Sequence, residues 1–383
     1  MKTDAAFVDQ QVEELIRGPQ YALRQAEKDI LLTSLLRVLC RQMAERCPAY
    51  GRFLARSGSN PDTWQAQADI PPLPVTMFKR FLLSAVPPEK VARQLYSSST
   101  TGEQPSRIVL DKTTAFRQAR ALSAILKEHI GPKRRPLLVL DAAESAGQGG
   151  SLSARAAAIR GLGNFASRTA FAMRTVASGE LEPDWDVLES FFAQHGGEPL
   201  LSFGFTFVVW DRFVRQAEQY GRRFHAPEAV LLHSGGWKKL SAQAVSKEEF
   251  NRRAATVLGC RERQILDFYG MVEQVGTVFV DCEAGNKHAP AFADVLIRRP
   301  LTLAPVSVGE TGIIEVLSAL PTSYPGQALI TEDQGTLLGV DDCPCGRRGN
   351  YFRFAGRIER AELRGCGDTF AQPTKSPLPL GEA

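Results

Sequence analysis

The sequence predicts an α/β protein in which a largely parallel sheet is followed by a small antiparallel β subdomain. Between residues 81 and 290, apolar runs typical of buried strands alternate with helical segments. From about residue 290, short strands separated by turns replace this alternation, which favours an antiparallel sheet or a small barrel. The 383 residues exceed one ordinary compact core, so we expect two subdomains or one large α/β domain.

We divide the chain into four parts. Residues 1–80 are predicted to be an N-terminal helical part of the same fold, residues 81–290 an α/β core, and residues 291–366 the β subdomain with a hinge-like segment. The proline-rich residues 367–383 are predicted to form a disordered tail.

Composition excludes several classes of function. Lys and Arg number 46 against 42 Asp and Glu, and no basic stripe with interleaved aromatic residues occurs, so we do not expect a nucleic-acid partner. The charged N-terminus does not resemble a signal peptide, and the longest apolar run, near residues 200–210, is too short to span a membrane. Seven cysteines in so long a chain do not form a disulfide scaffold, and we expect a cytoplasmic protein.

The predicted elements follow in order. Residues 9 to about 55 are predicted to be helical, with Leu32, Leu35, Leu36 and Leu39 on one face, and the proline-rich residues 69–74 end this part. A strand at 108–110 precedes a helix that we expect Thr113 or Thr114 to cap and in which Ala115, Ala119, Leu122 and Leu126 share a face. Further strands are predicted at 137–140, 200–203, 229–232 and 265–268, and, in the β subdomain, at 294–297, 312–317 and 328–330.

A loop rich in hydroxyl side chains is the first candidate site. Its members are Ser97, Ser98, Ser99, Thr100, Thr101 and Gly102. Several hydroxyl and backbone N–H donors can surround one phosphate, and a glycine permits a tight turn. The alternative is a solvated turn, and no Gly-Lys-Ser/Thr ending of a P-loop follows.

Two further segments follow strands of the predicted parallel sheet. Ser234, Gly235, Gly236 and Trp237 follow one strand, and Tyr269, Gly270, Met271 and Glu273 follow the next. Ligands of such sheets bind beyond the carboxyl ends of the strands. We therefore expect both segments to lie at one binding site.

Four motifs in order resemble the adenylate-forming superfamily, which includes acyl-CoA ligases and luciferase-type enzymes. Residues 96–107 look like its phosphate loop, 269–273 resemble its Tyr-Gly-Met-Thr-Glu motif, 331–333 its ribose-binding motif and 356–357 its hinge motif. The resemblance covers roughly residues 95–365. Ser99 stands where the family usually has Gly, and Arg107 lies where a Lys is usual.

One branch, the acyl-protein synthetases, is most similar, with phenylacetate-CoA ligases as relatives. His233-Ser-Gly-Gly-Trp-Lys-Lys-Leu240 and Gly356-Arg-Ile-Glu-Arg-Ala-Glu-Leu-Arg-Gly-Cys366 carry this likeness. Acyl-CoA ligases continue after the hinge into a domain with a catalytic lysine. This chain stops soon after its hinge motif. The resemblance therefore implies an adenylate-forming large-domain fold that lacks the domain with the catalytic lysine.

The resemblance also implies roles for these residues. ATP would bind with its adenine at residues 234–237, its ribose at Asp333 beside Arg357, and its phosphates at the hydroxyl-rich loop. Tyr269 would lie on the substrate side, and Glu273 would hold Mg²⁺. Glu273 could otherwise be a carboxylate at a helix start, and Asp333 a turn residue.

Cys366 is the candidate acyl acceptor. In acyl-protein synthetases a cysteine near the C-terminus takes the acyl group as a thioester, and Cys366 lies between glycines, where a thiolate can approach closely. Arg364 nearby would favour the thiolate, and tethering would make acyl transfer intramolecular. The alternative is an ordinary thiol on a tail.

A second constellation has the composition of a structural zinc site. Cys282 and His288 lie six residues apart, and Cys343 and Cys345 form a Cys-Pro-Cys pair. The four side chains make a site only if the fold brings the two halves together. Otherwise they are unrelated residues in a reducing compartment.

These motifs predict a ligase that uses ATP and Mg²⁺ to adenylate a carboxylic acid, with a long-chain fatty acid favoured, and then transfers the acyl group to Cys366. The family implies an acyl reductase that accepts the acyl group. Two alternatives remain: an aryl- or acyl-acid ligase that uses coenzyme A or a carrier protein, and a non-catalytic subunit that binds nucleotide as a scaffold.

Overall fold

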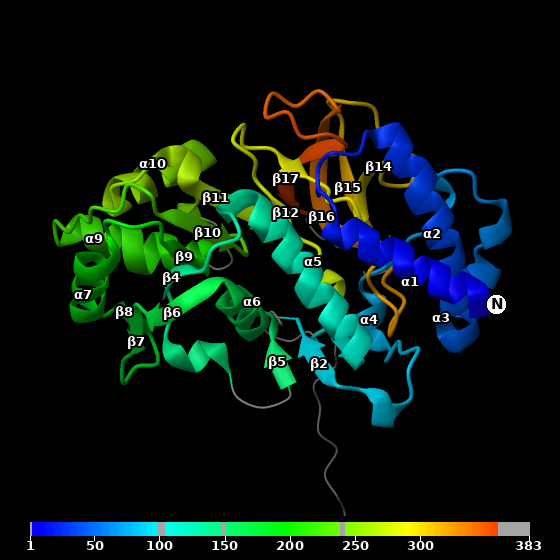
Figure 1. The fold of residues 1–383 in the computed structure, drawn as a ribbon, viewed down its shortest axis with the longest axis horizontal. Coiled ribbons are helices and arrows are strands. Elements are labelled where there is room, and N and C mark those ends of the chain that lie inside the picture. Colours follow the sequence, from blue (N-terminus) through cyan, green and yellow to red (C-terminus); the bar gives the residue numbers. More distant parts are fainter. Residues whose placement is uncertain (1, 98–103, 148–150, 238–241, 359–383) are drawn as a thin grey trace, which may run out of the picture.

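The computed structural model describes residues 2–97, 104–147, 151–237 and 242–358. It places a parallel sheet with its helices beside an antiparallel sheet that the N-terminal helices cover (Figure 1). Helix α5 (Lys112–Ile130) runs across the middle of the molecule between them (Figure 1). One apolar core joins residues of the N-terminal helices, α5 and both sheets.

The N-terminal part is helical, as predicted. It consists of α1 (Lys2–Arg17), α2 (Gln25–Arg46) and α3 (Pro48–Arg56). The four leucines predicted to share a face of α2 are each at most 2% exposed. Among the described residues no helix is long and apolar enough to cross a bilayer.

The parallel sheet has the strand order β12-β11-β10-β9-β4-β6, and all its neighbours are parallel except β12 with β11. Its strands are β4 (Arg135–Val139), β6 (Ala166–Phe171), β9 (Leu201–Phe205), β10 (Val230–Ser234), β11 (Ile265–Tyr269) and β12 (Phe279–Val280). The associated helices are α6 (Ala154–Leu162), α7 (Trp185–His195), α8 (Thr206–Val208), α9 (Arg215–Gln219) and α10 (Lys247–Leu258), with a π-helical stretch at Val209–Val214. The predicted parallel sheet is confirmed.

The antiparallel sheet follows the order β13-β17-β16-β15-β14, and β1 joins β16 in parallel. Its strands are β1 (Leu73–Pro74), β13 (Lys287–His288), β14 (Ala293–Arg298), β15 (Thr311–Ser318), β16 (Ala328–Val340) and β17 (Asn350–Arg357). Strand β16 is much longer than the predicted strand and carries the ribose motif within it. Asp333 is therefore a strand residue, and the turn alternative is wrong.

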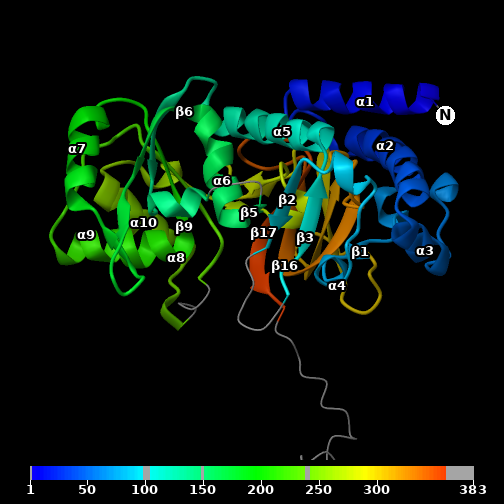
Figure 2. The same ribbon diagram turned by 90° about the horizontal axis from the view of Figure 1, so that it is seen from below.

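Smaller elements complete the fold. A third sheet contains β2 (Arg93–Tyr96), β3 (Arg107–Leu110) and β5 (Ser151–Ser153), and β7 (Met173–Thr175) pairs with β8 (Leu181–Pro183). The short helix α4 (Met77–Arg80) packs beside β3 (Figure 2). Single helical turns lie at Pro61–Thr63, Gln67–Asp69, Pro88–Lys90, Ala143–Ala146, Gly163–Phe165, Glu262–Gln264 and Val272–Gln274.

Helix α5 differs from its prediction in two respects. Asp111 is its N-cap, because the Asp111 side chain accepts a hydrogen bond from the Thr114 N–H, so neither Thr113 nor Thr114 has that role. Ala119 is exposed and therefore lies outside the buried face of the helix. That face carries polar residues that bond to other elements. Gln118 of this face donates to the Tyr324 hydroxyl. The four-part division of the chain stays a prediction.

Candidate functional site

The base of the hydroxyl-rich loop is closed by Ser97. The Ser97 N–H donates to the Ser106 carbonyl (3.1 Å), and the Ser106 N–H donates to the Ser97 hydroxyl (2.8 Å). This pair continues the β2–β3 hairpin, in which Tyr96 lies opposite Arg107. Ser97 therefore holds the two ends of the loop together. Ser98, Ser99, Thr100, Thr101 and Gly102 lie outside the described residues.

The segment after β10 turns sharply at the carboxyl end of its strand. Gly235 and Gly236 both have positive φ, at 93° and 62°, and a Cβ at Gly235 would lie 2.8 Å from the ring of Phe205. Glycine is thus required at position 235. Trp237 packs edge-on to Trp210, with ring centroids 5.6 Å apart, so its ring joins the aromatic cluster behind the segment.

Tyr269, Asp333 and Arg357 meet although they lie far apart in the sequence. The Tyr269 hydroxyl donates to Asp333 Oδ2 (3.0 Å), and Arg357 Nε lies 3.5 Å from Asp333 Oδ1. The pairing of β16 with β17 places Asp333 opposite Arg357. Burial raises the pKa of Asp333, while the Tyr269 hydroxyl and Arg357 oppose that shift. A carboxylate held by two partners is preorganised to accept hydrogen bonds from vicinal hydroxyls.

Glu273 lies in the turn at Val272–Gln274, behind Gly270 and Met271, and is 7% exposed. The Tyr324 hydroxyl donates to its backbone carbonyl (2.9 Å), which fixes the turn. Burial raises the pKa of the Glu273 carboxyl, and the Ser106 hydroxyl and the charge of Lys79 oppose that shift. Ser106 of the loop base and Glu273 therefore belong to one electrostatic environment.

Lys79 of α4 is a basic side chain at this site that the sequence did not single out. Its Nζ donates to Glu332 Oε2 at 3.0 Å, next to Asp333 in β16. Lys79 follows a proline-rich passage, and the sequence around it contains no recognised motif. The tertiary structure brings it to the site by pairing Leu73 of β1 with Leu329 of β16.

A buried ionic cluster lies beside the predicted adenine segment. Lys287 Nζ bonds to Asp267 (2.7 Å) and Asp281 (2.9 Å), and the charges of both carboxylates raise its pKa against the effect of burial. The Thr206 hydroxyl lies 3.0 Å from His233 Nδ1, whose pKa is lowered by burial. These bonds fix β11, β12 and β13 relative to one another.

The fold brings the four Cys and His residues of the second constellation together. The ligating atoms of Cys282, His288, Cys343 and Cys345 all lie within 4.8 Å of one another. The pairing of His288 in β13 with Tyr351 in β17 joins the two halves. Burial raises the pKa of Cys282 to about 12. For Cys345, burial has the same tendency, but hydrogen bonds from Arg347 and the neighbouring thiols outweigh it and lower the pKa.

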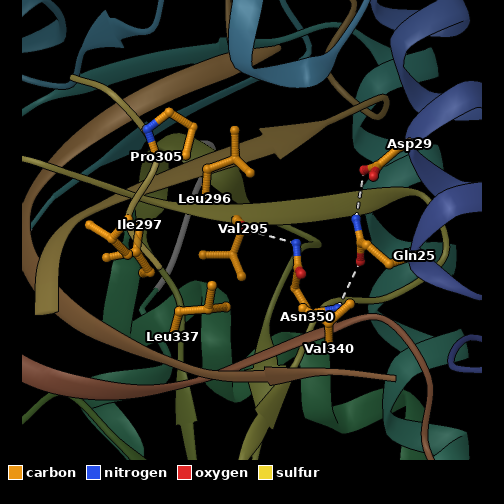
Figure 3. A pocket seen from close by; sticks show the side chains of 10 residues that line it. Gln25, Asp29, Val295, Leu296, Ile297, Pro305, Leu337, Val340 and Asn350 are labelled. Atoms are coloured by element: carbon orange, nitrogen blue, oxygen red, sulfur yellow. Dashed lines mark hydrogen bonds between the residues drawn. The ribbon is translucent and has the colours of Figure 1, made fainter. Parts of the chain in front are cut away.

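A separate hollow of about 280 Å³ lies where α2 meets the antiparallel sheet (Figure 3). Its lining consists of Gln25, Asp29, Val295, Leu296, Ile297, Pro305, Val306, Leu337, Val340 and Asn350. Its polar groups bond to one another: Gln25 donates to Asp29 (2.7 Å) and accepts from the Asn350 N–H (2.8 Å) (Figure 3). No residue of the predicted site lines this hollow, and Cys366 lies outside the described residues.

Solved structures of adenylate-forming ligases share this fold. An open conformation of 2-hydroxyisobutyryl-CoA ligase with 2-HIB-AMP and CoA matches with a TM-score of 0.65 and 17% identity, over 89% of this chain and 77% of that chain. The same ligase in its postadenylation state matches with a TM-score of 0.63 and 16% identity, over 89% and 70%. The predicted adenylate-forming fold is confirmed.

Relatives by sequence are two proteins named long-chain-fatty-acid–luciferin-component ligase. The one from Aliivibrio fischeri is 27% identical over 142 residues, and the one from Vibrio harveyi is 25% identical over 201 residues. The matched region covers 37% of this chain and 37% of the first relative, and 52% and 51% for the second, so it spans about half of these relatives or less. The family described as acyl-protein synthetase, LuxE, matches residues 8–374, nearly the whole chain, and the protein therefore belongs to the acyl-protein synthetase family.

Proposed function

We propose that this protein is an AMP-forming acid–thiol ligase that activates a long-chain fatty acid and transfers the acyl group to a protein thiol. The observation that carries the proposal is the family match over residues 8–374. The names of the two sequence relatives support a fatty acid as the substrate. An acyl reductase or acyl-carrier protein that takes the acyl group onward is part of the same proposal.

The first step joins the acid to AMP. A carboxylate oxygen of the fatty acid attacks the α-phosphorus of ATP, and the bond to the bridging oxygen breaks, so pyrophosphate leaves with the electron pair. Asp333, held by Tyr269 and Arg357, accepts hydrogen bonds from the ribose hydroxyls. The segment 234–237 borders the adenine, and the hydroxyl-rich loop that Ser97 closes surrounds the phosphates.

The second step transfers the acyl group to Cys366. Its thiolate attacks the carbonyl carbon of the acyl-adenylate, the carbon–oxygen bond to phosphate breaks, and AMP leaves with the electron pair. The thiol proton passes to solvent or to a phosphate oxygen. Because the acceptor thiol belongs to the same protein that binds the acyl-adenylate, the transfer takes place within one complex.

The residues present suit two metal ions. Glu273 offers a buried carboxyl with a raised pKa, and a nearby cation would lower that pKa again, which fits Mg²⁺. That ion would supply positive charge to the phosphates. The Cys282, His288, Cys343 and Cys345 set fits structural Zn²⁺, since three sulfurs and one imidazole converge and His288 Nδ1 is buried without a hydrogen-bond partner among the described residues. That ion would tie β13 and the segment before β17 together.

Acyl transfer is tested by intact-mass analysis of protein incubated with ATP, Mg²⁺ and a panel of fatty and aryl acids. We expect a hydroxylamine-labile acyl adduct on the wild type that is absent from Cys366→Ser. Cys260→Ser is the matched control, because Cys260 is a half-buried thiol whose pKa burial raises to about 11, and it should retain the adduct.

The other outcomes separate the alternatives. AMP release that requires coenzyme A, without any adduct, would indicate a ligase of the coenzyme A type. An adduct that persists in Cys366→Ser would move the acceptor to another side chain. No adduct and no ATP–pyrophosphate exchange with any acid would overturn the proposed activity and favour a scaffold.

A further inference from the structure

Three carboxylates crowd the proposed nucleotide site. The charge of Asp333 raises the pKa of Glu273, and the charge of Glu332 raises the pKa of Asp333. ATP brings further negative charge to this region. A site with this many acidic groups needs fixed positive charge to hold a triphosphate.

Two basic side chains pair with these carboxylates, Arg357 with Asp333 and Lys79 with Glu332. Arg357 approaches Asp333, where the proposed function places the ribose. Lys79 acts on Glu273, the same carboxyl that Ser106 at the base of the hydroxyl-rich loop acts on. Helix α4, which carries Lys79, also packs beside β3, the strand that follows this loop (Figure 2). These contacts put Lys79 near the described base of the loop to which the proposed function assigns the phosphates.

The structure holds the Lys79 ammonium in place. Its Nζ bonds to Glu332 Oε2 at 3.0 Å, and its side chain is only 22% exposed. The preceding Phe78 is 1% exposed and anchors α4 in the core. The Val75 N–H donates to the Ile330 carbonyl (3.0 Å), which fixes the start of this segment against β16. A cation fixed in this way does not need to be ordered when the phosphates arrive.

We propose that Lys79, oriented by Glu332, contacts the polyphosphate of ATP and stabilises the charge that develops on the departing pyrophosphate. This inference rests on the proposed function and adds a catalytic residue to it. Lys79 remains protonated throughout: it gains stronger hydrogen bonds as negative charge moves onto the leaving group, and no proton is transferred.

Ligand binding tests the inference without requiring turnover. Affinities for Mg-ATP, Mg-pyrophosphate and AMP are measured by calorimetry on the wild type, Lys79→Met, Lys79→Arg and Glu332→Gln. We expect Lys79→Met to weaken binding of ATP and pyrophosphate about tenfold or more and to change AMP binding less than about twofold. Lys79→Arg should recover part of the loss, because it keeps the charge.

Arg80→Met is the matched control, since Arg80 is the exposed neighbour of Lys79 on the same helix and should leave all three affinities unchanged. In ATP–pyrophosphate exchange, Lys79→Met should lower kcat about a hundredfold. Glu332→Gln should cost less, because it leaves the ammonium in place.

The results that overturn the inference are distinct. If Lys79 only ties α4 to β16, Lys79→Met and Glu332→Gln will lower the melting temperature equally and will weaken AMP and ATP binding equally or not at all. If the wild type exchanges pyrophosphate and Lys79→Met does so at the same rate, Lys79 has no catalytic role and the proposed function stands. If the wild type binds no ATP, both fail together.

Discussion

Replacing Tyr269 by Phe removes one hydroxyl and should impair ATP binding through Asp333. The Tyr269 hydroxyl donates to Asp333 Oδ2 (3.0 Å), and burial and the Asp333 charge raise the pKa of Tyr269 well above its usual value, so the hydroxyl is a donor at every working pH. The phenyl ring would keep its contacts with Phe354 and Phe352. The variant therefore tests the hydrogen bond itself.

The size of the effect follows from the geometry. A hydrogen bond to a charged group contributes about 1.5–3 kcal/mol, and each 1.4 kcal/mol corresponds to about tenfold in affinity. The remaining partner, Arg357, lies 3.5 Å from Asp333 with a side chain that is 68% exposed, so solvent screens it. We expect the KM for ATP to rise about tenfold, with a smaller change in kcat.

The assay is ATP–pyrophosphate exchange over a series of pH values. Because Tyr269 lowers the pKa of Asp333, its removal should also move the acidic limb of the profile to higher pH. Tyr351→Phe is the matched control: Tyr351 is likewise 8% exposed, and its hydroxyl lies near Asp342 instead of the nucleotide site. The reasoning is refuted if Tyr269→Phe changes the KM for ATP less than twofold, or if Tyr351→Phe changes it as much.

Three further perturbations address stability. Burial, with the charge of Arg347, lowers the pKa of His129 from its usual 6.5 to about 3. The unfolded chain therefore binds a proton that the folded chain does not, and the free energy of unfolding falls as the pH drops from 6.5 towards 3. In urea titrations, His129→Gln should reduce the decrease in unfolding free energy between pH 7.5 and 5 by about 1–2 kcal/mol. Cys343→Ser should lose bound zinc, which we expect at about one ion per chain in elemental analysis, together with a lower melting temperature. Asp111→Ala should cost about 1 kcal/mol of unfolding free energy, because it removes the cap of α5.

Each of these perturbations has its own control. His225→Gln should retain the wild-type dependence on pH, and an unchanged dependence in His129→Gln would contradict the assignment. Cys260→Ser should keep the metal; zinc-free wild-type protein of full stability would contradict a structural ion. Asp111→Asn should retain most of the stability, since an asparagine oxygen also accepts from the Thr114 N–H, and equal losses for Ala and Asn would show that capping is not the cause.

The sequence alone predicted strands β4, β9, β10 and β11 of the parallel sheet and β14, β15 and β16 of the antiparallel sheet, but it missed β6, β12, β13 and β17. Continuous apolar runs such as 137–140 and 229–232 can be buried only between layers, and the helices between them require parallel neighbours. The prediction failed where burial does not follow polarity. In α5, Arg117 is buried and ion-paired to Asp9 of α1, so the buried face could not be read from apolar spacing.

The candidate site was named from motifs, but its contacts come from pairings between distant segments. Tyr269 meets Asp333, 64 residues away, because β16 passes the end of β11. Lys79 meets Glu332 across 253 residues because β1 joins β16, and the Cys282 and Cys343 thiols meet because β13 joins β17. Local patterns encode strands, helices and turns, since these depend on neighbouring residues. Which strands become neighbours depends on how the whole chain buries its apolar surface, and only the tertiary structure decides that.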